Sequence, residues 1–193
     1  MSKNQLKLGI ITIPVGKAGV EPLLNLTNIL SRFSSDIYII SGNVFTAGCI
    51  SNHKVHVISI GYNYDSTVTK LFRHILLQLQ ISFALLNIAR KVDLFIFFYG
   101  GPILALPMLL SKILNKKVIL LLAGSSSESS KASRSLFSKP LYVLEKVNYL
   151  VAHKLVIYSK SLIEQWNLEK YQHKISIAPR HFLDFGKFKI EKP

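Results

Sequence analysis

The feature that most constrains the fold is a series of short apolar runs separated by longer helical patterns. The first run, residues 7–13, is rich in β-branched residues, lacks polar alternation and stops at Pro14. Such a run is typical of a strand buried on both faces, and strands of this kind belong to parallel sheets. Comparable runs predict further strands at residues 36–40, 55–60, 92–99, 117–122, 154–158 and 174–178.

The segments between these runs carry helical features. Residues 22–33 repeat apolar side chains at the spacing of one helix face. These side chains are Leu23, Leu26, Ile29, Leu30 and Phe33. Further helices are predicted at 66–90, 102–114, 140–151 and 162–168, the last with the capping-box spacing of Ser161 and Glu164. Strands that alternate with helices predict one Rossmann-like α/β domain over residues 1–190, a parallel sheet with helices on both faces.

Composition narrows the class of protein. The chain has 193 residues, of which 49% are hydrophobic, and its 24 Lys+Arg against 10 Asp+Glu give a net charge of +14. The high apolar content excludes a disordered polycation. The single cysteine, Cys49, excludes a disulfide-stapled domain, and we expect it to be a small buried hydrophobe. The basic balance suits nucleic acid, a phosphate-bearing ligand or an anionic membrane surface.

Targeting signals were sought at the N-terminus and in the apolar segments. The N-terminus is polar and lacks the features of a secretory signal. The longest apolar stretch, residues 71–89, contains Arg73, His74, Gln78, Gln80 and Asn87, which are too polar for a lipid-facing span. We therefore expect a cytoplasmic protein, either soluble or peripheral on the inner face of the membrane.

Three loops that follow predicted strands are candidate ligand sites, because open parallel sheets bind ligands beyond the carboxyl ends of their strands. They are residues 14–19, 99–102 and 123–127. The candidate acceptor-binding residues in them are Gly16, Lys17, Ala18, Gly19, Tyr99, Gly100, Gly124, Ser125 and Ser126. Each loop has a plainer alternative: a strand-to-helix turn for the first, Gly-Pro turn chemistry for the second, and a solvated serine-rich tether over 124–138 for the third.

Familiar catalytic and binding motifs do not occur in the sequence. The first loop matches neither the G-x-G-x-x-G fingerprint nor the P-loop. The six histidines show no metal-ligand spacing with Cys or acidic residues, so no metal is predicted. No G-x-S-x-G elbow or paired-carboxylate pattern is present, and the catalytic residues stay unknown.

Three segments resemble the GT-B glycosyltransferases of family 4. Residues 155–162 and 171–184, followed by Phe188, resemble the end of that family's N-terminal domain. Pro14, Ala18-Gly19 and Glu21, followed by Asn25-Leu26 and Leu30, look like its first loop and helix. Residues 92–96, Leu106-Pro107 and 116–118 are similar to a third element of the family, so the likeness covers nearly the whole chain.

The resemblance implies the acceptor-binding N-terminal half of a retaining, metal-independent enzyme. The family's C-terminal domain binds the nucleotide sugar, so no cofactor is expected on this half, and the sequence ends where a donor domain would begin. It further implies a glycan or lipid-phosphate acceptor and no transfer by the chain alone. With the donor half absent, the chain would be a fragment, a truncated gene product, or one subunit of a split enzyme with a separate donor-domain polypeptide. Lys17, with the amides of Ala18 and Gly19, would orient acceptor or phosphate groups.

Two departures from the family pattern affect the expected cleft. Ala123-Gly124 stands where many members carry His-Gly, which removes a histidine that often contacts the donor sugar. Arg180 and His181 replace a small residue and a glycine near the linker, and they add positive charge at the mouth of the cleft.

Two other function classes were weighed. A non-catalytic membrane-docking subunit would use Lys131, Arg134 and Lys139 beside Leu136 and Phe137, although such a cluster is equally typical of a solvated basic face. Nucleic-acid binding is not expected, because many aromatic residues lie inside predicted strands and no basic-aromatic module is recognisable.

Overall fold

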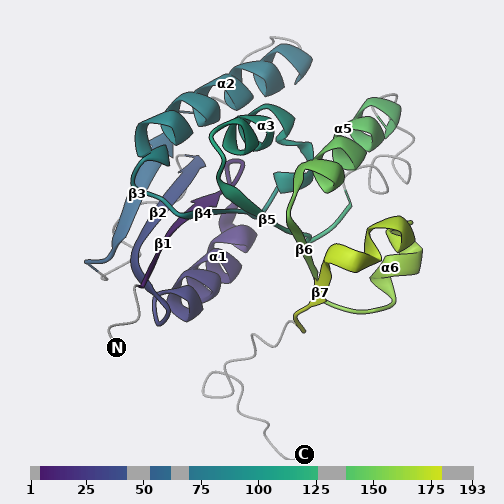
Figure 1. The fold of residues 1–193 in the computed structure, drawn as a ribbon. Helices are drawn as coiled ribbons and strands as arrows, with labels where there is room; N and C mark the ends of the chain where they lie inside the picture. The colour runs from purple at the N-terminus through teal and green to yellow at the C-terminus, as the bar shows by residue number, and fades with distance from the viewer. Residues whose placement is uncertain (1–4, 43–52, 62–69, 126–137, 180–193) are drawn as a thin grey trace, which may run out of the picture.

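The computed structural model describes residues 5–42, 53–61, 70–125 and 138–179. These residues form a seven-stranded, all-parallel sheet with the strand order β3-β2-β1-β4-β5-β6-β7 (Figure 1). The strands are β1 (Leu6–Ile11), β2 (Ser34–Gly42), β3 (Val55–Ile60), β4 (Leu94–Phe97), β5 (Lys117–Leu121), β6 (Lys154–Ile157) and β7 (Ile175–Ile177). All seven predicted strands are confirmed.

The helices lie on both faces of the sheet, as predicted. They are α1 (Lys17–Leu30), α2 (Lys70–Ala89), α3 (Ala105–Ile113), α5 (Ser138–Val151) and α6 (Leu162–Gln165), with short 3₁₀ helices η2 (Gly101–Ile103) and η3 (Glu169–Lys174). Figure 1 shows α2, α3 and α5 above the sheet and α1 below it. The Rossmann-like α/β class is therefore confirmed.

Each face of the sheet has its own core. On the upper face, Ile81 and Leu85 of α2 and Met108 of α3 are fully buried with Phe95 and Leu120 of the strands. On the lower face, Leu23 of α1 packs with Ile10, Ile39 and Phe98. The burial of β1 and β4 from both sides explains why their runs lack polar alternation.

Helix α1 starts five residues earlier than predicted, at Lys17, so Lys17, Ala18 and Gly19 form its first turn instead of a loop. Pro22 lies inside the helix. Inside a helix a proline removes a hydrogen bond and its ring crowds the carbonyl four residues earlier, which is why Pro22 was expected in the first turn; that expectation is wrong. The predicted buried face is also partly wrong, since Ile29 and Phe33 are exposed near the end of the helix.

Two further helix predictions need correction. The segment 102–114 is divided by Leu104 (φ −89°, ψ 64°) into η2 and α3. The Ser161–Glu164 capping box does not form, because Ser161 has helical backbone angles instead of the extended ones that an N-cap needs. The hydroxyls of Ser159 and Ser161 lie 2.8 Å apart instead.

Among the described residues, α2 is long and apolar enough, by length and composition alone, to cross a membrane over Phe72–Ala89. The polar residues of this segment therefore do not by themselves exclude a membrane-spanning helix. In the structure 44% of that window is buried inside the protein. Leu77, Ile81 and Leu85 supply much of this burial, so α2 is a helix that covers the sheet.

The C-terminal end of α5 is capped from a distance. The Lys174 ammonium donates hydrogen bonds to the carbonyl oxygens of Leu150 (3.1 Å) and Ala152 (2.8 Å). The last carbonyls of a helix have no intrahelical donors and carry partial negative charge, so a cation stabilises this end. Burial, together with the charge of Lys112, lowers the pKa of Lys174.

Candidate functional site

The candidate site lies where the strand order reverses, between β1 and β4. From β1 the chain proceeds outward to β2 and β3, then returns to β4 on the other side of β1. Loops at the carboxyl ends of such a strand pair diverge to opposite sides and leave a crevice for a ligand. The loops here are Thr12–Gly16 after β1 and Phe98–Gly100 after β4, which are two of the three predicted loops.

These two loops are joined directly. The amide of Ile13 donates to the carbonyl of Tyr99 (3.0 Å), and Phe98 donates to Ile11 (2.9 Å). Gly100 follows with φ +72°, the left-handed region that glycine adopts without strain. A Cβ added to Gly100 would lie 2.5 Å from Cγ2 of Ile13, so both the backbone angle and the space require glycine at this position.

The N-terminus of α1 opens onto the same loops. Gly16 precedes the helix, and no side chain among the described residues caps this end. Gly19, in the first turn, lies against Val15 and the Tyr99 ring; a Cβ on it would be 3.6 Å from Cε2 of Tyr99. Gly19 thus lies beside Tyr99 and Gly100 beside Ile13, and the acceptor-binding role of Gly16, Gly19, Tyr99 and Gly100 stays a prediction. Free amides at a helix start attract anions.

Lys17 and Ala18 occupy the first turn of α1 through their backbone. Their side chains lie outside the described residues, so the role given to the Lys17 ammonium stays a prediction. The backbone amides of Lys17 and Ala18 lie at the positive end of the α1 dipole. That position suits a phosphate or carboxylate better than a cation.

The third loop divides into an exposed and a buried part. Gly124 is exposed, with nothing within 4 Å of the place where a Cβ would be. Ser125 is buried, and its hydroxyl donates to Oε2 (3.2 Å) of Glu145 in α5. The Ser125 side chain thus belongs to the junction with α5, and Gly124 is left as the accessible backbone of this loop.

Glu145 and Asn148 support two of the loops, and the sequence argument missed both. The Asn148 amide donates to the carbonyls of Gly101 (3.3 Å) and Pro102 (2.7 Å), while Glu145 holds Ser125. Both side chains are buried and lie three residues apart on one face of α5. The sequence signal that could have identified Glu145 and Asn148 is their three-residue spacing, which puts two polar side chains on the apolar face of a predicted helix.

A tyrosine pair packs beside these two side chains. The rings of Tyr149 and Tyr171 meet edge to face with their centroids 5.7 Å apart. Burial, followed by the nearby charge of Glu145, raises the pKa of Tyr149, so its phenol stays protonated at neutral pH. This pairing joins α5 to η3 and gives the supporting helix a rigid base.

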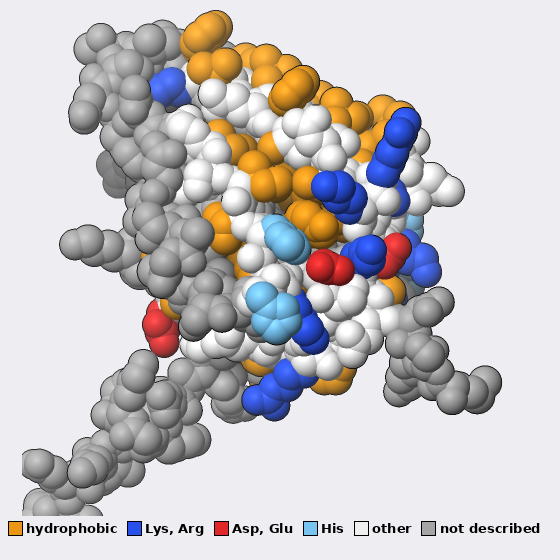
Figure 2. All heavy atoms as spheres, turned by 90° about the vertical axis from the view of Figure 1, so that its left-hand side faces the viewer, with side chains coloured by type: hydrophobic (Ala, Val, Ile, Leu, Met, Phe, Trp, Pro, Cys, Tyr) orange, Lys and Arg blue, Asp and Glu red, His pale blue; other side chains and the backbone are white. Residues whose placement is uncertain are grey.

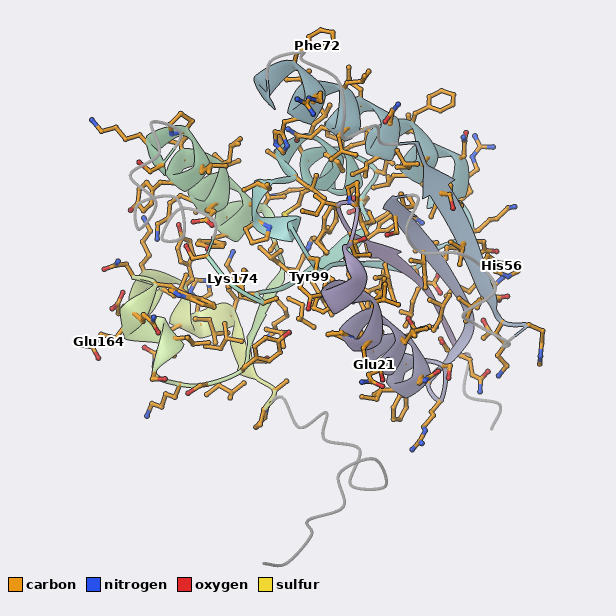
Figure 3. All side chains as sticks on the ribbon, turned by 180° about the vertical axis from the view of Figure 1, so that it is seen from behind. Glu21, His56, Phe72, Tyr99, Glu164 and Lys174 are labelled. Atoms are coloured by element: carbon orange, nitrogen blue, oxygen red, sulfur yellow. The ribbon has the colours of Figure 1, made fainter. Side chains whose placement is uncertain are left out.

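A shallow pocket of about 570 Å³ opens beyond β6, apart from the predicted residues. Its lining combines Lys160, Ser161 and Ile163 with Glu164, Glu169 and Gln172. Figure 3 shows Glu164 on α6, well away from Tyr99 near the middle of the sheet. The pocket contains none of the predicted site residues.

The histidines of the described segments are dispersed. His74 in α2 is hydrogen-bonded to the carbonyl of Ile103 (3.2 Å), and burial lowers its pKa. His56 in β3 stacks on Tyr38 and lies 3.5 Å from Asp36. Within the described residues, no three His, Cys, Asp or Glu side chains are grouped as metal ligands.

Several predictions fall outside the described residues. These are Ser126 of the serine-rich loop, Lys131, Arg134, Leu136 and Phe137 of the proposed docking cluster, Cys49, and the linker residues Arg180 and His181. Of that docking cluster, Lys139 is described, and it is exposed on the first turn of α5.

Neither a family model nor a curated protein sequence matches the chain. Solved structures do. Arabidopsis thaliana UGT89C1 complexed with UDP-L-rhamnose matches with a TM-score of 0.63 at 13% identity, over 94% of this chain and 54% of that one. A glycosyltransferase from Rickettsia africae matches with a TM-score of 0.57 at 17% identity, over 98% of this chain and 48% of that one.

A third match is to a protein named for a different activity. A UDP-N-acetylglucosamine 2-epimerase from Listeria monocytogenes, so named provisionally, gives a TM-score of 0.56 at 12% identity, over 90% of this chain and 45% of that one. At such identities the likeness shows the fold and leaves the reaction open. The chain spans about half the length of the structures it matches, and it has the fold of one Rossmann-like half of the GT-B architecture.

Proposed function

We propose that the chain is the N-terminal, acceptor-binding half of a nucleotide-sugar-dependent glycosyltransferase of the family 4 type. The observation that carries the proposal is the joined pair of loops at the β1/β4 switch point, with the α1 N-terminus beside them. The half-length match to a glycosyltransferase and to a protein that binds UDP-L-rhamnose supports the same function.

The chemistry follows from the division of labour between two halves. This half would hold a phosphate-bearing lipid or glycan acceptor, with its anionic group at the α1 amides and its hydroxyl near Gly100. A donor domain would bind the nucleotide sugar, so that the acceptor oxygen forms a bond to the anomeric carbon while the bond to the nucleoside diphosphate breaks and the diphosphate takes up the hydroxyl proton. Exclusion of water and alignment of the two substrates would supply the rate enhancement.

The two loops are suited to positioning a substrate because they are rigid. Gly100 has a backbone conformation and a neighbour, Ile13, that leave it little freedom. Asn148 fixes the following carbonyls from a separate helix. A site built on such fixed backbone orients its ligand without first having to order itself.

A sugar-transfer assay tests this function. The chain is incubated with labelled UDP-sugars and a bacterial lipid extract, alone and together with a donor-domain polypeptide of a family 4 enzyme. We expect no transfer by the chain alone and measurable transfer by the pair. Robust transfer by the chain alone would contradict its assignment as one half of an enzyme.

The second candidate function for this chain is a non-catalytic membrane-docking subunit, which differs from the first in its effect on sugar transfer. A docking subunit would bind vesicles and would add nothing to transfer by any donor domain. The loop geometry at β1/β4 favours the acceptor-binding function, because docking alone does not need a left-handed glycine at a strand switch point.

A further inference from the structure

The outward side of α2 is covered with large apolar side chains. Phe72, Leu76, Leu79, Phe83 and Leu86 are all exposed and follow one another at intervals of four and three residues. That spacing places them in one stripe along the helix. The buried side chains Leu77, Ile81 and Leu85 lie on the opposite side, against the sheet. The helix therefore has one apolar face for its own core and a second one that faces outward.

Helix α3 continues this surface. It packs beside α2, and its side chains Leu106, Leu109 and Ile113 are exposed, the last at 79%. Figure 2 shows hydrophobic side chains along the upper edge of the molecule, where α2 lies, and Figure 3 shows Phe72 projecting outward from the end of that helix. We name this surface the outer apolar face. Its members are Phe72, Ile75, Leu76, Leu79, Phe83, Leu86, Leu106, Leu109 and Ile113.

The stretch of sequence that contains α2 and α3 is basic. Between residues 66 and 127 the sequence has a single acidic residue, Asp93. That carboxylate accepts a hydrogen bond from the backbone amide of Lys7, at the amino edge of the sheet. The same segment contains Lys70, Arg73, Arg90, Lys91, Lys112, Lys116 and Lys117. An apolar surface flanked in sequence by basic residues is complementary to a partner that has an apolar interior and anionic groups at its surface.

We propose that the outer apolar face binds an anionic lipid bilayer, with α2 and α3 lying in the plane of the membrane surface. Their leucine, isoleucine and phenylalanine side chains enter the acyl region, while Arg90 and Lys112 contact lipid phosphates. Amphipathic helices bind membranes by this combination of apolar burial and attraction to anionic headgroups. The surface differs from the cluster at 131–139 that the sequence suggested, and it does not depend on the proposed transfer activity.

A second copy of the chain fits this face less well. Two copies pairing through α2 would bring basic residues together, because α2 contains no Asp or Glu that could form an interhelical salt bridge. The face also extends over α3, beyond the width that one partner helix would cover. An apolar surface that spans two helices of a basic segment suits a bilayer better than a coiled coil.

Vesicle flotation of the full chain tests the proposal, with vesicles of phosphatidylcholine alone or mixed with phosphatidylglycerol. The test variant combines Leu79→Gln and Phe83→Gln, whose side chains are 51% and 68% exposed. The control combines Ile29→Gln and Phe33→Gln, which are 48% and 67% exposed near the end of α1, on the other side of the sheet. Thermal unfolding of both variants checks that the fold is retained.

We expect the chain to bind the mixed vesicles, and to bind them less as salt is added or phosphatidylglycerol is removed. The Leu79/Phe83 variant should bind at least about tenfold more weakly, because two large apolar side chains are lost from the acyl region. The control variant should bind within about twofold of the wild type, since its substitutions lie outside the outer apolar face.

Four results would overturn the proposal. They are no binding to mixed vesicles, equal binding to neutral vesicles, wild-type binding by the Leu79/Phe83 variant, and an equal loss in the control variant. Sedimentation velocity adds a further check. If the wild-type chain does not float with vesicles but forms a dimer, and the Leu79/Phe83 variant is monomeric, the outer apolar face would be the interface with a second copy. None of these results bears on sugar transfer, so the two proposals fail independently.

Discussion

Replacement of Gly100 by alanine tests whether the loop after β4 is held in a left-handed geometry that only glycine adopts without strain. At φ +72° an alanine costs about 1–2 kcal/mol, because its Cβ crowds the following carbonyl. The same Cβ would lie 2.5, 2.7 and 2.8 Å from three carbon atoms of the Ile13 side chain, which must move. Overpacking of this kind costs about 1–3 kcal/mol. The free energy of unfolding should therefore fall by about 2–5 kcal/mol.

Gly124 provides the matched control in the neighbouring loop. It has open space around its Cα and no positive φ, so Gly124→Ala should leave stability unchanged or raise it by up to about 1 kcal/mol. Urea denaturation followed by far-ultraviolet circular dichroism measures both variants, with the slope m checked for constancy. The reasoning is refuted if Gly100→Ala unfolds within about 0.5 kcal/mol of the wild type, or if Gly124→Ala loses as much as Gly100→Ala.

Three further variants test the packing around the sheet. Burial lowers the pKa of His74 below 6.5, so the unfolded chain binds the extra proton first and stability falls as the pH drops below 6.5. Urea midpoints at several pH values should show a shallower decline for His74→Gln, and an identical slope would contradict this origin. Lys174→Met removes the cap on α5 and should cost about 1 kcal/mol in thermal unfolding, whereas an unchanged melting temperature would exclude a capping role. Leu85→Ala leaves a cavity in the buried core and should lower the free energy of unfolding by about 2–5 kcal/mol. Leu86→Ala, at the exposed neighbouring position, should lower it little. Comparable losses of stability in the two variants would mean that α2 is oriented differently.

The strands were predictable because each is a short, local apolar run. The β-branched and aromatic content of residues 7–13 and 92–99 predicts buried strands, and β1 and β4 contribute side chains to the cores on both faces of the sheet. Helix ends were less predictable: Pro22, a residue that helices usually tolerate only in the first turn, lies inside α1. The Ser161–Glu164 motif had the right spacing, but the backbone at Ser161 prevented the cap.

The candidate site was predictable at the level of loops and not at the level of their support. The rule that open parallel sheets bind ligands beyond the carboxyl ends of their strands selected three loops from the sequence, and the strand order in the structure then singles out those after β1 and β4. Asn148 supports the segment after β4 and Glu145 the loop after β5, from 20 to 47 residues away in sequence, and no local pattern carries such contacts. The outer apolar face was likewise hidden, since α2 has large apolar side chains on two opposite sides and its sequence does not tell which side packs on the sheet.

The central claim, an acceptor-binding half, is tested most directly by amide NMR of the isotope-labelled chain. Two probes are titrated separately: farnesyl phosphate, as a lipid-phosphate acceptor, and UDP-glucose, as a donor. We expect farnesyl phosphate to shift the amides of Gly16, Ala18, Gly100 and Gly124, and UDP-glucose to leave them unchanged. The opposite result, with UDP-glucose saturating these amides and farnesyl phosphate leaving them in place, would make the chain a donor-binding domain and contradict the account.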